Sequence, residues 1–257
     1  VPTHFLRMLD LPEETRHSYD LSSLRCVMHT GAPCPVETKH AMIEWFGPII
    51  VEIYAGTERI GGTMIRSAEW LAHPGSIGRV ANGTAHVVNE ETWDEVSTGE
   101  VGVIYFESGE NFSYHGDEKK TQDLYSPQGW RTLGDIGRMD DEGYLYLTDR
   151  KSNMIISGGV NIYPQESENR ILTHPKVADV AVFGIPNEAF GEEVKAVVQP
   201  AAGVEASEEL AAELIDYCKE VLAPLKCPRS VDFETELPRQ DNGKLYKRQL
   251  VDRYRER

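Results

Sequence analysis

The spacing of apolar and polar residues predicts a chain of mixed helix and strand structure. Pro35 suits the first position of a helix over residues 35–46, and Gly47 directly after that segment is typical of a helix C-terminal cap. Residues 49–54 form a short run rich in β-branched and aromatic side chains, which favours a strand. Because this strand runs into a glycine turn, polar side chains are expected to be exposed directly after it.

Two further strands are predicted at residues 100–106 and 144–148. The second of them follows residues 140–143, an acidic turn sequence that ends in glycine and is typical of a reversal in chain direction. Residues 131–148 are therefore expected to form a β-hairpin.

The organisation of the chain changes after the charged residues 149–152, and a domain boundary is predicted near Ser152. A short apolar run at 154–156 follows, and it leads into two glycines. The basic segment from 244 to 257 closes the chain.

Helices and strands are predicted to alternate beyond that boundary. A proline favours the start of a helix over residues 164–172, and apolar runs predict strands at 178–183 and 194–199. Ser207 is the predicted N-cap of an amphipathic helix at 208–222, whose apolar residues recur at helical spacing.

Length and charge narrow the class of protein. With 257 residues the chain can form one large domain or two ordinary ones, and its 40% hydrophobic and 26% charged residues are usual for a globular protein. The formal net charge of −16 argues against broad binding to nucleic acid or to an anionic membrane surface, because both are polyanions. A small, locally positive site can still bind an anionic small molecule.

The cysteines favour a reducing compartment. Cys26, Cys34, Cys218 and Cys227 include no pair at CxxC spacing, and no histidines lie at zinc-ligand intervals beside them. We therefore expect reduced thiols in a cytoplasmic protein. No apolar run approaches the ~20 residues that a membrane-spanning helix needs, and no secretory signal is visible.

The turn after the strand at 49–54 carries the first candidate chemistry. The ring of Tyr54 can stack on a purine base, the hydroxyl of Thr57 can bind a phosphate, and the carboxylate of Glu58 can hold Mg²⁺. Taken alone, residues 54–58 fit an ordinary strand-end turn with a capping threonine better than a ligand site. Asp135, at the end of the segment 130–135, can accept two hydrogen bonds from a ribose diol, or can cap its own turn.

Residues 149–159 and 241–244 carry the remaining candidate groups. Arg150 can contact ribose or phosphate oxygens, and the two glycines at 158 and 159 let a ligand approach the backbone. A charged linker before a glycine turn explains the same residues without a ligand. Lys244, on a glycine loop, can reach a phosphate during its transfer, or can be a solvated surface lysine.

In order and spacing, these motifs resemble the adenylate-forming superfamily of acyl-CoA synthetases, firefly luciferases and the adenylation domains of peptide synthetases. The resemblance covers nearly the whole chain, and six motifs in the correct order make it specific. The matching segments are 29–33, 54–58, 99–121, 131–135, 149–159 and 242–244. Similarity to fatty and aryl acyl-CoA synthetases is greatest at 149–151, 155–159 and 161–164.

The resemblance implies an ATP-dependent acid–thiol ligase that converts a carboxylate and ATP to an acyl-adenylate, and then forms acyl-CoA and AMP. By the family pattern, Gly31, Ala32 and Pro33 line the adenine and Tyr54 stacks on it. Asp135 binds the ribose hydroxyls. The implied ligands are the carboxylic acid, ATP or AMP, Mg²⁺ and coenzyme A.

The same pattern assigns the charged chemistry. Thr57 binds the α-phosphate, Glu58 holds Mg²⁺, and Arg150 assists at the ribose. Lys244 bridges the substrate carboxylate and the α-phosphate during adenylation. Positive charge is needed there because two anions approach each other.

The resemblance also implies two domains and a fold of the α/β and α+β classes. Residues 1–151 are expected to be the later part of a large domain, with a strand–helix portion and a distorted β-barrel-like portion. Residues 153–257 are expected to form a small mobile α+β lid, with Ser152 as the hinge. Gly158 and Gly159 flank the pantetheine channel once the lid has rotated.

Several positions depart from the family pattern. Ala55 replaces the usual glycine after the stacking tyrosine, and Leu133 interrupts the Arg-Thr-Gly-Asp motif. The family's phosphate loop and most of its acyl pocket are not found in the sequence. We therefore expect the chain to be the C-terminal portion of a synthetase, inactive alone. His29 is either part of the acyl pocket or a packed histidine.

Two alternatives stay open. The acyl group could pass to a carrier-protein thiol or to oxygen in another adenylate-forming enzyme. The chain could also be a noncatalytic nucleotide-binding or interaction module. The sequence does not identify the acid, and the oligomeric state is open, with a homodimer as one option.

Overall fold

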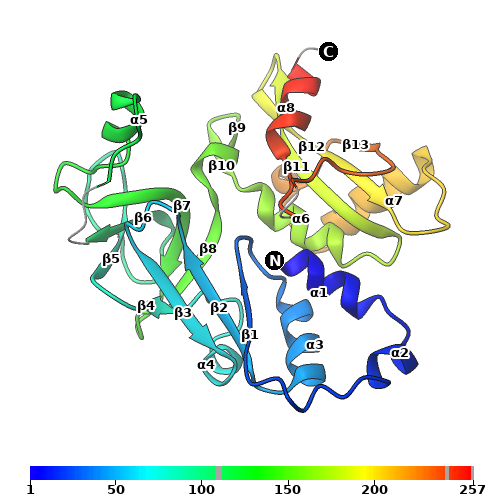
Figure 1. Cartoon of the computed structure of the whole chain (residues 1–257). Coiled ribbons are helices and arrows are strands. Elements are labelled where there is room, and N and C mark those ends of the chain that lie inside the picture. Colours follow the sequence, from blue (N-terminus) through cyan, green and yellow to red (C-terminus); the bar gives the residue numbers. More distant parts are fainter. Residues whose placement is uncertain (108–111, 241–242, 256–257) are drawn as a thin grey trace. The chain divides into compact units, whose positions relative to one another are not determined.

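We describe a computed structural model of the chain, which covers residues 1–107, 112–240 and 243–255, with residue 255 by its backbone alone. It divides into two compact units, Val1–Thr148 and Asp149–Arg257 (Figure 1). This division lies just before Ser152. A division into units says nothing of motion, so the hinge at Ser152 stays a prediction.

The first unit begins with helices and a four-stranded sheet in the order β1-β2-β3-β4. The strands are β1 Val27–Thr30, β2 Ile50–Ala55, β3 Gly62–Arg66 and β4 Arg79–Val80. The helices of this unit are α1 Pro2–Leu9, α2 Glu13–His17, α3 Val36–Phe46, α4 Ser67–Ala72 and α5 Glu118–Gln122. Strands β1 and β2 are parallel, and α3 provides the crossover that parallel neighbours require.

Helix α3 confirms the helix expected at 35–46 to within one residue. Pro35 lies at the N-cap rather than in the first turn, and Gly47 ends the helix with φ of 78°, a backbone conformation that favours glycine. The helix buries Met42 and Ile43 against Ile50 of β2. This packing fixes the loop between β1 and α3 next to the end of β2.

A second four-stranded sheet follows in the order β5-β6-β7-β8. Its strands are β5 Thr84–Val88, β6 Gly102–Glu107, β7 Arg131–Met139 and β8 Leu145–Arg150. The hairpin expected at 131–148 is confirmed by β7 and β8. The expected barrel-like portion is an open sheet, and no closed barrel forms among the strands of residues 1–107 and 112–148.

The second unit contains a five-stranded sheet in the order β10-β9-β12-β11, with β13 also paired to β12. The strands are β9 Ile155–Ser157, β10 Val160–Ile162, β11 Val177–Asn187, β12 Gly191–Pro200 and β13 Ser230–Phe233. The helices are α6 Pro164–Leu172, α7 Glu208–Lys219 and α8 Lys247–Arg255, with short 3₁₀ turns η1 Lys151–Asn153 and η2 Pro224–Lys226. The expected mixture of helices and sheets is therefore confirmed.

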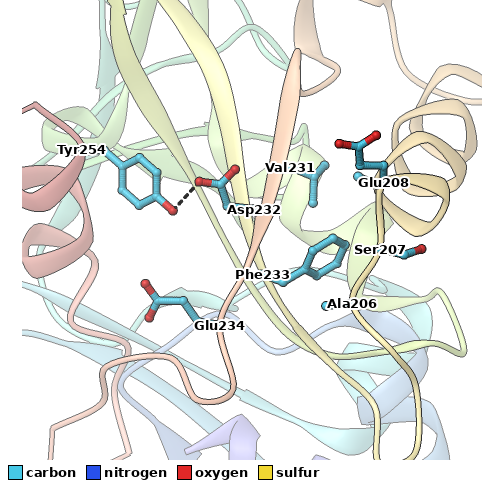
Figure 2. A pocket seen from close by; sticks show the side chains of 9 residues that line it. Ala206, Ser207, Glu208, Val231, Asp232, Phe233, Glu234 and Tyr254 are labelled. Carbon is cyan, nitrogen blue, oxygen red and sulfur yellow. Dashed lines mark hydrogen bonds between the residues drawn. The ribbon is translucent and has the colours of Figure 1, made fainter. Parts of the chain in front are cut away.

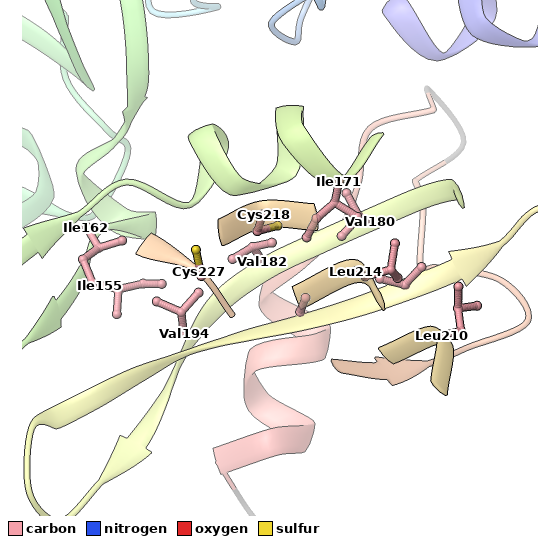
Figure 3. Close-up of a cluster of buried hydrophobic side chains, with 12 residues drawn as sticks. Ile155, Ile162, Ile171, Val180, Val182, Val194, Leu210, Leu214, Cys218 and Cys227 are labelled. Atoms are coloured by element: carbon pink, nitrogen blue, oxygen red, sulfur yellow. The ribbon is translucent and has the colours of Figure 1, made fainter. Parts of the chain in front are cut away.

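Helices cover both faces of this sheet. Val180 and Val182 of β11 pack with α6 and α7, as Figure 3 shows. The alternate residues Ala181 and Phe183 pack with Leu250 of α8. Successive side chains of a strand point to opposite faces, so burial on both sides explains the continuous apolar run seen in the sequence.

In this unit, local sequence signals predicted the starts of the helices more accurately than they predicted the lengths of the strands. Helix α6 has the expected bounds, and the Ser207 side chain accepts a hydrogen bond from the backbone N–H of Leu210, as an N-cap should. Strands β11 and β12 are longer than expected because they pair almost throughout as one antiparallel hairpin. Helix α7 ends at Lys219 rather than at residue 222.

The structure also bears on the expectations about the cysteines and about membrane-spanning helices. The four cysteines are all free thiols. Within the part of the chain that the structure describes, no helix is long and apolar enough to cross a membrane.

Candidate functional site

The parallel pair β1 and β2 determines where the expected adenine loop begins. Thr30 of β1 is the register partner of Ile53 of β2, so the two strands end side by side. Gly31, Ala32 and Pro33 follow β1 and are exposed. Ligands of open α/β sheets bind outside the carboxyl ends of such strands.

Tyr54 and Asp135 meet although they lie far apart in the sequence. The Tyr54 hydroxyl donates to Oδ2 of Asp135 over 2.5 Å. Asp135 is only 3% exposed, and the Tyr54 ring lies 6.2 Å from the ring of Phe106. The structure therefore joins the residue expected to stack on a base with the residue expected to bind the ribose.

A bulge in β7 positions Asp135. The pairing with β6 shifts between Val103, opposite Ile136, and Tyr105, opposite Thr132, which leaves extra residues on β7. Gly134 lies in that bulge with φ of 77°. Bulges redirect side chains at sites of this kind.

Leu133 occupies the same bulge and contacts the turn after β2. A Cβ atom added to Gly56 would lie 2.5 Å from Cδ2 of Leu133 and 2.6 Å from Oε2 of Glu58. The side chain that interrupts the expected motif therefore packs over the glycine of residues 54–58. A larger residue at this position would require the side chains of Leu133 and Glu58 to move.

Glu58 is oriented by a tyrosine that the sequence did not single out. The Tyr114 hydroxyl donates to Oε1 of Glu58 over 2.8 Å, and the Thr57 hydroxyl donates to Oε2 over 3.3 Å. A Mg²⁺ ion commonly takes one or two protein carboxylates and completes its shell with phosphate and water oxygens. One carboxylate beside a threonine hydroxyl fits that requirement.

In the second unit, Asp149 organises the segment that carries Arg150. The Asp149 carboxylate accepts hydrogen bonds from the backbone N–H of Arg150 at 2.6 Å and of Gln165 at 2.8 Å, and from the Asn153 amide at 3.0 Å. These contacts tie the segment to the start of α6. Arg150 and Ser152 themselves are exposed.

Gly158 and Gly159 form the two-residue turn between β9 and β10. Ser157 and Val160 are register partners, and the two glycines have φ of 58° and 80°. Such a turn needs positive φ at both positions, which explains both glycines without a ligand. The N–H of Gly158 donates to the carbonyl of Phe190 over 2.8 Å.

Lys244 is exposed in a tight loop that precedes α8. The N–H of Gln240 donates to the Lys244 carbonyl over 2.9 Å, and the N–H of Gly243 donates to the Gln240 carbonyl over 2.8 Å. Asp241 and Asn242, which belong to the same predicted motif, lie outside the described residues.

A buried charged cluster in the first unit was not found from the sequence. Lys39 of α3 lies 2.5 Å from Oε2 of Glu52, which is 6% exposed, and Lys39 itself has no exposed surface. His29 of β1 is 2% exposed, with Nε2 3.6 Å from the same carboxylate oxygen and its ring edge-on to Phe5. Within this chain His29 is a packed histidine.

Burial dominates the electrostatics of this cluster. It lowers the pKa of His29 to about 3, and the charge of Lys39 acts in the same direction. Burial also lowers the pKa of Lys39 and raises the pKa of Glu52, while each charge stabilises the other. The pKa of Cys34 rises to about 12, so this thiol stays protonated. A lysine–glutamate ion pair can only be inferred once α3 and β2 are packed together.

Acid should weaken the fold through His29. The unfolded chain binds a proton at a histidine pKa of about 6.5, whereas folded His29 stays neutral down to a pKa of about 3. Below pH ~6.5 the unfolded state therefore binds more protons, and the free energy of unfolding falls by up to about 1.4 kcal/mol per pH unit. Denaturant unfolding between about pH 5 and 8 measures this slope.

The matched variant for this measurement is His29→Asn, which removes the titrating ring and leaves Lys39 and Glu52 in place. The difference in unfolding free energy between wild type and variant should narrow as the pH falls. Parallel pH profiles for the two proteins would show that His29 has the same pKa in the folded and unfolded states, which would contradict the expected shift.

Figure 2 shows a groove of about 430 Å³ in the second unit, between the N-terminus of α7 and β13. Asp232 in this groove accepts hydrogen bonds from Lys195 at 2.6 Å and from the Tyr254 hydroxyl at 2.7 Å. Glu234 accepts from Arg253 at 2.9 Å. None of the residues predicted to bind nucleotide lines the groove. The lining residues are Ala206, Ser207, Glu208, Ala211, Val231, Asp232, Phe233, Glu234 and Tyr254.

Each of the two units contains a segment that matches a known protein family. Residues 1–113 match the family described as AMP-binding enzyme, and residues 166–244 match the AMP-binding enzyme C-terminal domain. A long-chain-fatty-acid–CoA ligase of Bacillus subtilis is 34% identical over 252 residues, which cover 98% of this chain and 44% of that ligase. The chain spans about half the length of the curated relatives it matches.

Solved structures give the same result. ATP-bound MatB from Rhodopseudomonas palustris matches with a TM-score of 0.86 at 30% identity, over 99% of this chain and 50% of that one. The o-succinylbenzoate CoA synthetase MenE of Bacillus subtilis, in complex with its acyl-adenylate intermediate, matches with a TM-score of 0.78 at 31% identity, over 97% and 49% of the two chains.

Proposed function

Because this chain belongs to the family of AMP-binding enzymes, we propose that the protein is an ATP-dependent acyl-CoA synthetase. The observation that carries the proposal is the contact between Tyr54 and Asp135. It brings the ring that we propose to stack on the base next to the carboxylate that we propose to bind the ribose. The exposed loop at 31–33 would line the adenine from the neighbouring strand end.

The proposed reaction has two steps. A carboxylate oxygen of the acid attacks the α-phosphorus of ATP, the bond to the leaving pyrophosphate breaks, and an acyl-adenylate forms. The sulfur of coenzyme A then attacks the acyl carbonyl, its proton passes to solvent, and AMP leaves. The first step brings two anions together, so its transition state needs positive charge at the α-phosphate.

Thr57 and Glu58 are the residues of the first unit proposed to act at the phosphates. The Thr57 hydroxyl would donate to an α-phosphate oxygen. Glu58, held by Tyr114 at 2.8 Å, would hold Mg²⁺ through its carboxylate. When bound, Mg²⁺ supplies charge that neutralises the phosphate oxygens.

The second unit would supply Lys244 for adenylation and the turn at Gly158 and Gly159 for the pantetheine arm of coenzyme A. Arg150 would assist at the ribose, and Ser152 would be the hinge between the two arrangements. Lys244 and Arg150 are both exposed, which supports these roles at a ligand. A cytoplasmic location is part of the proposal and is supported by the free thiols of the four cysteines.

The proposed substrate is a fatty or aryl carboxylic acid. A fatty-acid–CoA ligase and an aryl-acid CoA synthetase are among the proteins similar to this chain. In the full-length enzyme, pyrophosphate release should depend on MgATP and on one of a panel of fatty and aryl acids, and AMP and a thioester should accumulate only with coenzyme A. The 257-residue chain by itself should release little pyrophosphate. Pyrophosphate release without thioester formation would favour another acyl acceptor, such as a carrier-protein thiol. Failure to bind AMP or ATP would refute the proposal.

Asp135 offers the sharpest test of the nucleotide site. Asp135→Ala should raise KM for ATP and weaken AMP binding by about 1.5–3 kcal/mol, the typical contribution of hydrogen bonds to a charged group. Calorimetry with AMP and steady-state kinetics measure the two effects. Asp140→Ala is the control, because Asp140 caps the next turn of the same hairpin and should leave AMP binding unchanged. Equal losses in both variants would contradict the assignment.

A further inference from the structure

Arg239 connects the loop that carries Lys244 to the central sheet of the second unit. Its guanidinium donates from Nη1 to the carbonyl oxygen of Gly243, the residue directly before Lys244, over 2.6 Å. From Nε it donates to Oδ2 of Asp179 over 2.9 Å, and its Nη2 also contacts that oxygen. One side chain thus holds the loop backbone and a strand at the same time.

Asp179 is itself fixed in position. It lies on β11, and its Oδ1 accepts a hydrogen bond from the N–H of Val180 over 2.9 Å. Val180 is 3% exposed and belongs to the core between the sheet and its helices. A carboxylate held on a buried strand gives Arg239 a rigid anchor.

Two further contacts hold the residues that flank this loop. The N–H of Tyr246 donates to the carbonyl of Pro238 over 2.8 Å. Lys247, at the start of α8, lies 2.7 Å from the buried carboxylate of Glu168 on α6. These contacts hold the base of the loop, and the Arg239 side chain reaches the backbone beside Lys244.

We propose that Arg239 is a positioning residue for adenylation, acting through the backbone of Gly243 to hold Lys244 where the α-phosphate is attacked. The inference rests on the role proposed for Lys244. A charge stabilises a transition state only when it is held in place beforehand, and a misplacement of 1 Å can cost about 100-fold in rate.

Arginine is needed at this position because two acceptors must be held at once. The planar guanidinium carries donors on three nitrogens, which Arg239 divides between a carboxylate and a carbonyl. A lysine has one nitrogen and would keep the contact with Asp179 or the contact with Gly243. Arg239→Lys therefore keeps the charge and loses the bridge.

The experiment uses the full-length enzyme and measures the two half-reactions separately. Adenylation is followed by acid-dependent exchange of pyrophosphate into ATP, and thioester formation by the reaction of supplied acyl-adenylate with coenzyme A. Arg239→Met should lower kcat of adenylation by about 10- to 100-fold, with KM for ATP and the thioester step nearly unchanged. Arg239→Lys should lower the same rate by about tenfold and retain the melting temperature of the wild type.

Arg170 provides a matched control in the same unit. It also joins a carboxylate and a backbone carbonyl, with Glu220 at 2.7 Å and the Tyr217 carbonyl at 3.0 Å, and it links α6 to α7 away from the lysine loop. Arg170→Met should leave the ratio of the two half-reactions unchanged. Equal losses in both half-reactions for Arg239→Met, or the same loss in Arg170→Met, would overturn the inference.

Lys244→Ala separates this inference from the proposed function. If Lys244→Ala slows adenylation and Arg239→Lys does not, the positioning role fails while the role of Lys244 stands. If Lys244→Ala has no effect on adenylation, the role proposed for Lys244 fails first. Should Arg239→Met not fold, Arg239→Lys decides the matter alone through the same two rates.

Discussion

In the full-length enzyme, replacement of Lys244 by alanine is expected to slow acyl-adenylate formation by about 10²- to 10³-fold, or ~3 kcal/mol, and to leave thioester formation nearly unchanged. The two half-reactions differ in their need for positive charge. The attack of a carboxylate on the α-phosphate brings two anions together, whereas the attack of a thiol on an acyl-adenylate does not. A lysine that acts at the phosphate should therefore matter in the first step alone.

Pyrophosphate exchange and the consumption of supplied acyl-adenylate measure the two steps. Lys219→Ala is the matched control, because Lys219 is an exposed lysine of the same unit, paired with Asp216 on α7. It should change neither rate. Equal losses in both half-reactions for Lys244→Ala would refute the role assigned to Lys244, and would indicate damage to the fold or to a shared binding step.

Lys39→Met is expected to lower the free energy of unfolding by about 3–5 kcal/mol, the usual cost of removing one partner of a buried ion pair. Glu52 is 6% exposed and would keep a carboxylate in the interior without the ammonium that now lies 2.5 Å away. Its pKa, already raised by burial, would rise further, because the stabilising charge of Lys39 is gone. The protein should respond by protonating Glu52 or by admitting water.

A double-mutant cycle with Glu52→Leu isolates the pair. The double variant should be much more stable than the sum of the two single losses predicts, since buried pairs can be replaced by apolar residues at little cost. Lys176→Met is the control, because Lys176 pairs with Glu213 at the surface and should cost about 0–1 kcal/mol. Denaturant melts of the four cycle members give the coupling free energy, and additive losses would contradict a buried pair.

Short-range signals in the sequence were sufficient for several elements. The start of α6 follows from Pro164, and the start of α7 follows from Ser207, because a helix cap involves residues within one turn of each other. The turn at Gly158 and Gly159 is equally local. The order of the six motifs, and with it the family, could also be read directly.

Contacts between distant residues required the folded chain. Tyr54 meets Asp135 because a bulge in β7 redirects the carboxylate, and a shift of one residue in a strand would turn each side chain to the other face. The hydrogen bond between Tyr114 and Glu58 also joins residues far apart in the sequence. It could not be predicted, because nothing near Tyr114 in the sequence indicates it.

The residue types and local turns of this protein thus follow from its sequence, whereas the partners of its charged groups follow only from packing. No residue near Lys39 in the sequence indicates its contact with Glu52 of β2, which forms only when α3 packs against the sheet. In the same way, the contact of Arg239 with Asp179 depends on where β11 lies in the fold. The physical reason is that a hydrogen bond or ion pair depends on distances of a few ångströms, which the register of strands and the packing of helices determine.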